Sequence, residues 1–180
     1  MPKRLIFLLG GARSGKSRYA EAWARGQGAH LLFVATAQAG DDDMAARIAA
    51  HRANRPTHWH TLEAARQVPQ RIAGCAIPHD TLLLDCLTLL TSNLLLDLPE
   101  STAQGDANEA ILREIDALLA VYERSDATWL LVSNEVGMGV VPPSRLGTLF
   151  RDMLGRANQR VAERADEVIL LVAGLPWKLK

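Results

Sequence analysis

The stretch from residue 5 to residue 17 reads LIFLLGGARSGKS, an apolar run that leads directly into a glycine-rich segment. Residues 10–17 satisfy the pattern G-x-x-x-x-G-K-[ST], whose glycines let the backbone turn tightly and present a row of N–H groups to phosphate oxygens. Lys16 brings a positive charge to the β and γ phosphates, and the Ser17 hydroxyl can ligate Mg²⁺. The pattern lies between a predicted strand and a predicted helix, which aims its positive end at the same place. The stretch therefore predicts a phosphate-binding loop.

A second carboxylate is expected near such a loop, at the end of a neighbouring strand, where it holds the magnesium ion through water. Asp85 follows the apolar run 81–84 and meets this requirement. The alternative is an ordinary helix cap before Leu87. Beside a phosphate-binding loop, we favour the magnesium role.

The rest of the chain repeats the alternation of a short apolar run and a longer helical pattern. The runs lack strict alternation, which is typical of strands buried on both faces of a parallel sheet. This order predicts an α/β fold in one domain over residues 1–180, with a mainly parallel sheet flanked by helices on both faces. We expect strands at 4–9, 31–35, 81–84, 128–132 and 167–172, a short edge strand at 175–179, and helices at 16–25, 43–54, 64–73, 87–96, 108–123 and 144–165.

The amino-acid composition argues against nucleic acid and membrane as partners. The 180 residues include 20 basic and 20 acidic ones, without the basic excess that a nucleic-acid binder normally shows. The apolar runs are too short, or too often interrupted by polar residues, for a signal peptide or a membrane span, so we expect a cytoplasmic protein. Cys75 and Cys86 fit no zinc or redox spacing and are expected to be reduced thiols.

The residues alone favour a small-molecule kinase. The N-K-x-D pattern of guanine-specific switch proteins is absent from the sequence, and the chain is too small for a motor or helicase. Two interpretations of the residues stay open. One is a plain kinase for another small alcohol, and the other is a non-catalytic protein whose bound nucleotide controls a partner.

Several further segments, in order along almost the whole chain, resemble one family. This is the bifunctional adenosylcobinamide kinase/adenosylcobinamide-phosphate guanylyltransferase family of cobalamin biosynthesis. The most specific segment is SNEVGMG at residues 133–139. The others are GGARSGKS at 10–17, ATA at 35–37, DDM at 42–44 with Arg47, Ile48 and His51, W-x-T-x-E at 59–63, LDCLT at 84–88 with Asn93 and Leu94, residues 150–159, and ADEV at 165–168.

The resemblance implies a RecA-like homotrimer that performs two reactions on a corrinoid. The first phosphorylates the aminopropanol hydroxyl of adenosylcobinamide with ATP or GTP and Mg²⁺. The second transfers GMP from GTP through a guanylylated histidine, releasing pyrophosphate and giving adenosylcobinamide-GDP. By position, His51 is the guanylylated histidine and Lys16 the second catalytic residue. The implied nucleotide contacts are Gly10, Gly11, Ala12, Arg13, Ser14, Gly15, Lys16, Ser17, Ala35, Thr36, Ala37, Arg52, Ala53, Asn54, Arg55, Glu63 and Asp85.

The chemistry is reasonable for His51. On a helix, Arg47 and His51 share a face, and a neutral imidazole is a competent nucleophile towards an α-phosphate. Arg52 and Arg55 add cations that can contact phosphate. The alternative is a core histidine, because Met44, Ile48 and His51 also follow a helical stripe. The family pattern favours the nucleophile.

Other polar residues have two interpretations each. Residues 59, 61 and 63 should point the same way on period two, so that Glu63 reaches a ribose or guanine edge; alternatively Glu63 opens a helix. The loop with Asn134, Glu135, Gly137 and Gly139 is expected near the corrinoid or a subunit interface. His58 and His60 lack the carboxylate partner of a zinc site. The charged residues Arg151, Asp152 and Arg156 belong either to a site or to ordinary surface pairs.

Overall fold

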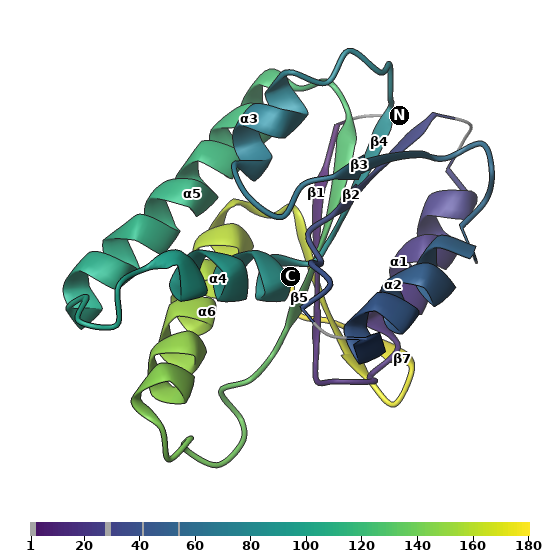
Figure 1. The fold of residues 1–180 in the computed structure, drawn as a ribbon. Helices are drawn as coiled ribbons and strands as arrows, with labels where there is room; N and C mark the ends of the chain where they lie inside the picture. The colour runs from purple at the N-terminus through teal and green to yellow at the C-terminus, as the bar shows by residue number, and fades with distance from the viewer. Residues whose placement is uncertain (1–2, 28–29, 41, 54) are drawn as a thin grey trace.

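The computed structural model describes residues 3–27, 30–40, 42–53 and 55–180, except for the side chains of Asp43, Met44, Arg47 and His51. Its strands join in one seven-stranded sheet in the order β3-β2-β4-β5-β1-β6-β7 (Figure 1). All neighbours are parallel except β6 and β7. The strands are β1 (Leu5–Gly10), β2 (Leu31–Ala35), β3 (His60–Glu63), β4 (Thr81–Asp85), β5 (Thr128–Asn134), β6 (Glu167–Val172) and β7 (Leu175–Lys178).

Helices cover both faces of the sheet, as predicted. Figure 1 shows α1 (Lys16–Arg25) and α2 (Asp42–Ala53) on one face, and α3 (Val68–Ala73), α4 (Leu87–Asp97), α5 (Gln104–Arg124) and α6 (Arg145–Arg164) on the other. Residues of β1 alternate between two apolar clusters. Ile6 and Leu8 pack on the α1 side, whereas Leu5 and Phe7 pack under the larger helical layer. The mainly parallel α/β sheet is confirmed.

Three predicted boundaries were wrong in informative ways. The helix expected at 64–73 begins only at Val68, because residues 64–67 form an irregular connection from β3, in which Gln67 has a φ of 52°. The helix expected from residue 108 begins at Gln104, where Asp106 in the first turn complements the helix dipole. The strand expected at 128–132 continues to Asn134. None of these shifts changes which end of the sheet the loops occupy.

The two edges of the sheet are short strands. The predicted edge strand is confirmed as β7, which forms a hairpin with β6 through Ala173 and Gly174, both with positive φ (51° and 84°). The Leu179 N–H donates to the Val168 carbonyl at 2.8 Å. By alternation, Pro176 lies where the backbone of β7 faces away from β6. Within the described residues, no helix is long and apolar enough to cross a membrane.

Candidate active site

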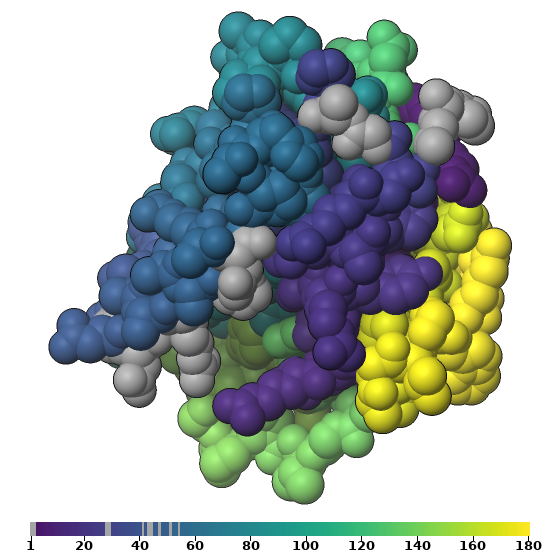
Figure 2. Space-filling view, turned by 90° about the vertical axis from the view of Figure 1, so that its right-hand side faces the viewer, coloured from purple at the N-terminus to yellow at the C-terminus, as the bar shows by residue number. Residues whose placement is uncertain are grey.

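The phosphate-binding loop joins β1 to α1 at the carboxyl edge of the sheet and requires glycine at two positions. A Cβ on Gly10 would lie 2.4 Å from Ser14 Oγ and 2.6 Å from the Leu171 carbonyl oxygen. Gly15 has φ 94°, and a Cβ there would lie 3.2 Å from Gly174 Cα. The Gly174 N–H also donates to the Ser14 carbonyl at 2.8 Å. The turn of the β6–β7 hairpin therefore supports the loop, and Figure 2 shows this yellow hairpin packed against the purple amino-terminal segments.

Lys16 is the buried cation of the loop. The residue is 8% exposed, and Nζ donates to the Gly11 carbonyl at 2.9 Å. Burial lowers the pKa of the Lys16 ammonium from its ordinary value, and the Asp85 carboxylate opposes this shift. In the described part of the chain, the buried Ser14 Oγ has no hydrogen-bond partner. A buried cation and an unpartnered hydroxyl in the same loop are suited to a phosphate group, which would give both a partner.

Asp85 ends β4 near this cation, in register with Ala35 of β2. Thr36 locks the two strand ends together, since its hydroxyl accepts from the Cys86 N–H at 2.8 Å and donates to the Cys86 carbonyl at 2.7 Å. Burial raises the pKa of the Cys86 thiol to about 12, so the thiol stays neutral. The carboxylate therefore is the acidic group at this strand end.

The residues fit a nucleotide-bound magnesium ion. Mg²⁺ at such sites takes one or two protein oxygens, with phosphate oxygens and waters completing the octahedron. Ser17 in the first turn of α1 and Asp85 at the end of β4 can supply them. No group of three or more His, Cys, Asp or Glu side chains in the described residues forms a metal site that would bind without a nucleotide.

A second polar group lies at the outer strands of the same edge. Arg52 of α2 pairs with Glu63 of β3 at 2.8 Å. The Arg55 guanidinium lies 3.8 Å over the Phe33 ring and reaches the Thr61 hydroxyl at 3.5 Å. Burial lowers the pKa of Arg55, whereas the carboxylates of Glu63 and Asp85 raise it. The buried Nε of Arg55 has no hydrogen-bond partner among the described atoms, so this cation retains a donor for a ligand.

Two buried amides hold the loops of the site, and sequence reasoning assigned them no role. Asn93 of α4 donates to the carbonyls of Thr36 and Ala65 at 2.9 and 3.1 Å. Asn158 of α6 donates to the Asn134 carbonyl at 3.0 Å and accepts from the Ser133 hydroxyl at 2.7 Å. The signal was their polarity on otherwise apolar helix faces.

The structure thus gathers the predicted nucleotide contacts at one edge of the sheet. His51 lies on α2 by its backbone, its side chain being outside what is described, and Asn54 lies outside the described residues. The expectation for residues 59, 61 and 63 was partly wrong. Thr61 and Glu63 both reach arginines, but Trp59 precedes β3, is 6% exposed and stacks on Phe33. Trp59 is a core residue because its ring closes the apolar cluster under α1.

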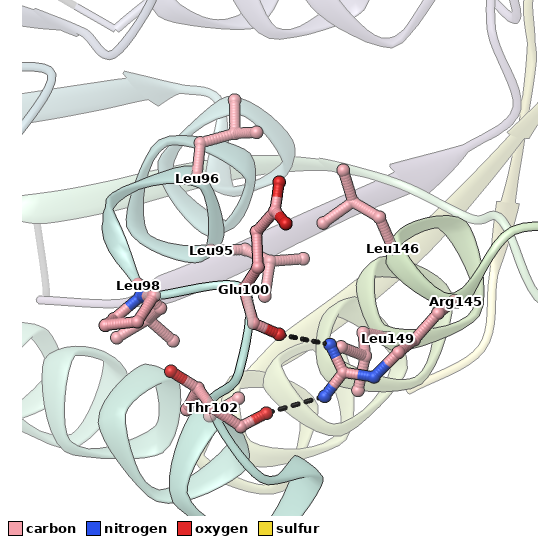
Figure 3. Close-up of a pocket in the computed structure, with 10 residues that line it drawn as sticks. Leu95, Leu96, Leu98, Glu100, Thr102, Arg145, Leu146 and Leu149 are labelled. Carbon is pink, nitrogen blue, oxygen red and sulfur yellow. Dashed lines mark hydrogen bonds between the residues drawn. The ribbon is translucent and has the colours of Figure 1, made fainter.

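Two other hollows are separate from the phosphate-binding loop. One, of about 450 Å³, is lined by Gly137, Arg156 and the ion pair Arg151–Asp152, whose 3.2 Å contact is the surface pairing left open by the sequence. The other, of about 140 Å³, lies between α4 and α6 and is mostly apolar (Figure 3). There Arg145 donates to the carbonyls of Glu100 and Thr102 at 2.8 and 2.6 Å, which ties the α4–α5 loop to α6.

These features define an α/β protein of the P-loop class: the order of the strands in the sheet, the glycine-dependent loop, the buried Lys16 and the strand-end Asp85. The family described as cobinamide kinase / cobinamide phosphate guanyltransferase matches residues 6–179. The chain belongs to this family.

Curated relatives agree over nearly their full lengths. The chain is similar to the bifunctional adenosylcobalamin biosynthesis protein CobU of Salmonella typhimurium, with 46% identity over 98% of this chain and 99% of the relative. The Escherichia coli protein of the same name is 45% identical over the same shares. The bifunctional adenosylcobalamin biosynthesis protein CobP of Pseudomonas aeruginosa is 44% identical over 96% of this chain and 95% of its own length.

Proposed function

We propose that this chain phosphorylates the aminopropanol hydroxyl of adenosylcobinamide and then transfers GMP from GTP to the resulting phosphate. The products of the second reaction are adenosylcobinamide-GDP and pyrophosphate. Membership of a family whose description names a kinase and a guanyltransferase supports both halves. The three curated relatives are likewise named bifunctional.

The observation that carries this proposal is the length of the polar edge. The phosphate-binding loop follows β1, and Glu63 ends β3, four strand positions away in the sheet order. Neighbouring strands are about 4.8 Å apart, so the two ends of the site are separated by roughly 19 Å. A nucleoside triphosphate is elongated. Its tail would lie at Lys16, its metal between Ser17 and Asp85, and its nucleoside beside Arg55 and Glu63.

His51 would be the nucleophile of the second reaction. Imidazole nitrogen attacks the α-phosphorus of GTP, the bond to the β-phosphate oxygen breaks, and pyrophosphate leaves with that electron pair. The phosphate oxygen of the corrinoid then displaces the histidine. Lys16 and Arg52 would neutralise charge on the pyrophosphate and on the transferred group. Splitting the transfer into two displacements requires a histidine near the α-phosphate, and α2 leads into the Arg52–Arg55 segment beside Glu63.

The remaining expectations belong to the same proposal. The enzyme would act as one domain over residues 1–180, in the cytoplasm, as a homotrimer with Mg²⁺ bound at the nucleotide. ATP or GTP would donate the phosphoryl group, and the corrinoid would be the other substrate.

GTP labelled at the α-phosphate tests the covalent step. The wild-type protein should acquire an acid-labile, alkali-stable label that adenosylcobinamide phosphate chases into product. His51→Ala should acquire none. His30→Ala is the matched control. His30 is exposed and directly precedes β2, at the end of that strand opposite to the candidate site.

Label that survives in His51→Ala would refute the assignment of the nucleophile. Wild-type protein that takes up no label but phosphorylates adenosylcobinamide would reduce the proposal to a kinase.

A further inference from the structure

A hollow of about 340 Å³ lies directly beside the phosphate-binding loop, and Asp85 is not among the residues that line it. One wall is residues 11–14 of the loop and the other is residues 170–173 at the end of β6. Glu135 and Met138, which follow β5, form the rim. Because β5, β1 and β6 are neighbours in the sheet, the hollow is formed by three adjacent strand ends.

The lining suits an uncharged, partly apolar group. Apart from Arg13, the walls are small or aliphatic, and Met138 and Val172 are 81% and 55% exposed. Beyond the phosphate-binding loop itself, a phosphate would find only the Arg13 guanidinium, which the Glu135 carboxylate opposes. An alcohol on an alkyl arm would find apolar walls and one acceptor for its O–H.

Glu135 is held close to the phosphate-binding loop through its backbone. The Glu135 N–H donates to the carbonyl of Gly10, the first glycine of the loop, at 3.0 Å. Glu135 Oε1 accepts from the Gly137 N–H at 2.6 Å. A Cβ on Gly137 would lie 2.9 Å from that oxygen, so glycine there lets the carboxylate close onto its own loop.

The strand end before Glu135 is equally fixed. The Asn134 N–H donates to the Thr88 hydroxyl at 2.7 Å, and its carbonyl accepts from Asn158 at 3.0 Å. Asp85, by contrast, ends β4, which is separated from β1 by β5. Glu135 is therefore the strand-end carboxylate adjacent to the loop, and Asp85 is the one placed for the metal.

We propose that this hollow receives the hydroxyl-bearing arm of the acceptor in the phosphoryl-transfer reaction, and that Glu135 accepts the hydroxyl proton. This inference rests on the proposed function. The acceptor oxygen attacks the γ-phosphorus and forms the new P–O bond. The bond from that phosphorus to the β–γ bridging oxygen breaks, and its electron pair leaves with the nucleoside diphosphate. The proton passes to Glu135 Oε2, since Oε1 holds Gly137.

The two reactions of one protein allow a selective test. Phosphorylation of adenosylcobinamide and GMP transfer to separately prepared adenosylcobinamide phosphate are measured for wild type, Glu135→Gln and Glu109→Gln. Glu109 is exposed on α5 and lines no part of the site. A general base contributes about 10²- to 10⁴-fold, so Glu135→Gln should lower kcat for phosphorylation by that factor. GMP transfer should stay within about twofold of wild type.

Filling the hollow tests where the acceptor binds. Val172→Trp should raise KM for adenosylcobinamide in phosphorylation and leave KM for ATP unchanged. Val140→Trp, at a residue that is 94% exposed and outside the hollow, is the matched control.

Any one of the following outcomes would overturn the inference. Equal loss of both reactions in Glu135→Gln would assign the carboxylate a structural role, and unchanged phosphorylation would remove it from the reaction. A raised KM for ATP in Val172→Trp would make the hollow a purine site. If wild type transfers GMP but phosphorylates nothing, the inference fails and the guanylyltransferase half stands; if it does neither, the proposed function itself fails.

Discussion

Replacing Asn93 by leucine should destabilise the protein, because it removes the hydrogen bonds that hold the segments after two strands. The amide is 9% exposed and donates to the carbonyls of Thr36 and Ala65, which follow β2 and β3. Leucine has nearly the same size but donates nothing, so the buried carbonyl of Thr36 and the half-buried carbonyl of Ala65 lose their partner. Each such loss costs about 1–3 kcal/mol, and we expect a decrease of about 2–4 kcal/mol in the free energy of unfolding. For a chain of this size, a loss of about 3 kcal/mol lowers Tm by roughly 6–12 °C.

Urea denaturation followed by circular dichroism measures this change. An unchanged m value would show that unfolding exposes the same amount of surface in both proteins. GTP affinity should also fall, because Thr36 lies beside Asp85 and Ala65 follows Glu63. The matched control is Gln104→Leu, whose exposed amide makes one 3.4 Å contact with Asp152 and should change stability by less than about 0.5 kcal/mol. A loss below about 0.5 kcal/mol in Asn93→Leu, with an unchanged m value, would refute the claim that this amide holds the loops.

Three further predictions concern the loop, a helix cap and a thiol. Gly10→Ala should lower stability by about 1–3 kcal/mol and abolish nucleotide binding in equilibrium dialysis, because its Cβ would overlap Ser14 Oγ and the Leu171 carbonyl; normal GTP affinity would contradict the loop geometry. Ser144→Ala should cost about 1 kcal/mol in urea denaturation, since Ser144 Oγ caps α6 by accepting from the Gly147 N–H at 3.1 Å; a neutral result would mean that the cap is replaced by water. Cys86 has a pKa raised to about 12 against an ordinary 9.0, so the unfolded thiol ionises first, and stability present below about pH 9 should fall by about 1.4 kcal/mol per pH unit above it. Cys86→Ala should reduce that slope, and equal slopes in the two proteins would count against the buried neutral thiol.

The sequence predicted the sheet well where burial alone decides the pattern. The run at 31–35 matches β2, which is buried at every residue, because a strand covered on both faces needs continuous apolar side chains. The run at 167–172 matches β6, which is partly exposed at its ends. The strand β3 was not among the expected strands, although residues 59–63 were interpreted with a period of two. Three of its four residues are exposed, and an exposed edge strand has no apolar signature. Its place was set by pairing with β2, which is a tertiary contact.

The candidate site divides in the same way. The phosphate-binding loop was predictable because its backbone conformation demands particular residues at a fixed spacing. The cation over Phe33 was not, because the contact joins Arg55 to a strand 22 positions earlier in the chain. Glu135 was predicted only to lie in a glycine-rich loop near the corrinoid or a subunit interface, with no chemical role of its own. Its closeness to Gly10 depends on β5 lying next to β1, an order that no local pattern encodes.

The outer strand β7 limits how this protein can meet other chains. Pro176 has no N–H, and it lies at a position whose backbone faces away from β6. A strand from another chain that paired with β7 would therefore lack one hydrogen-bond donor in the middle of the pairing. The opposite border, β3, is only four residues long. Edge strands of this kind disfavour edge-to-edge aggregation, although the strands between them are apolar.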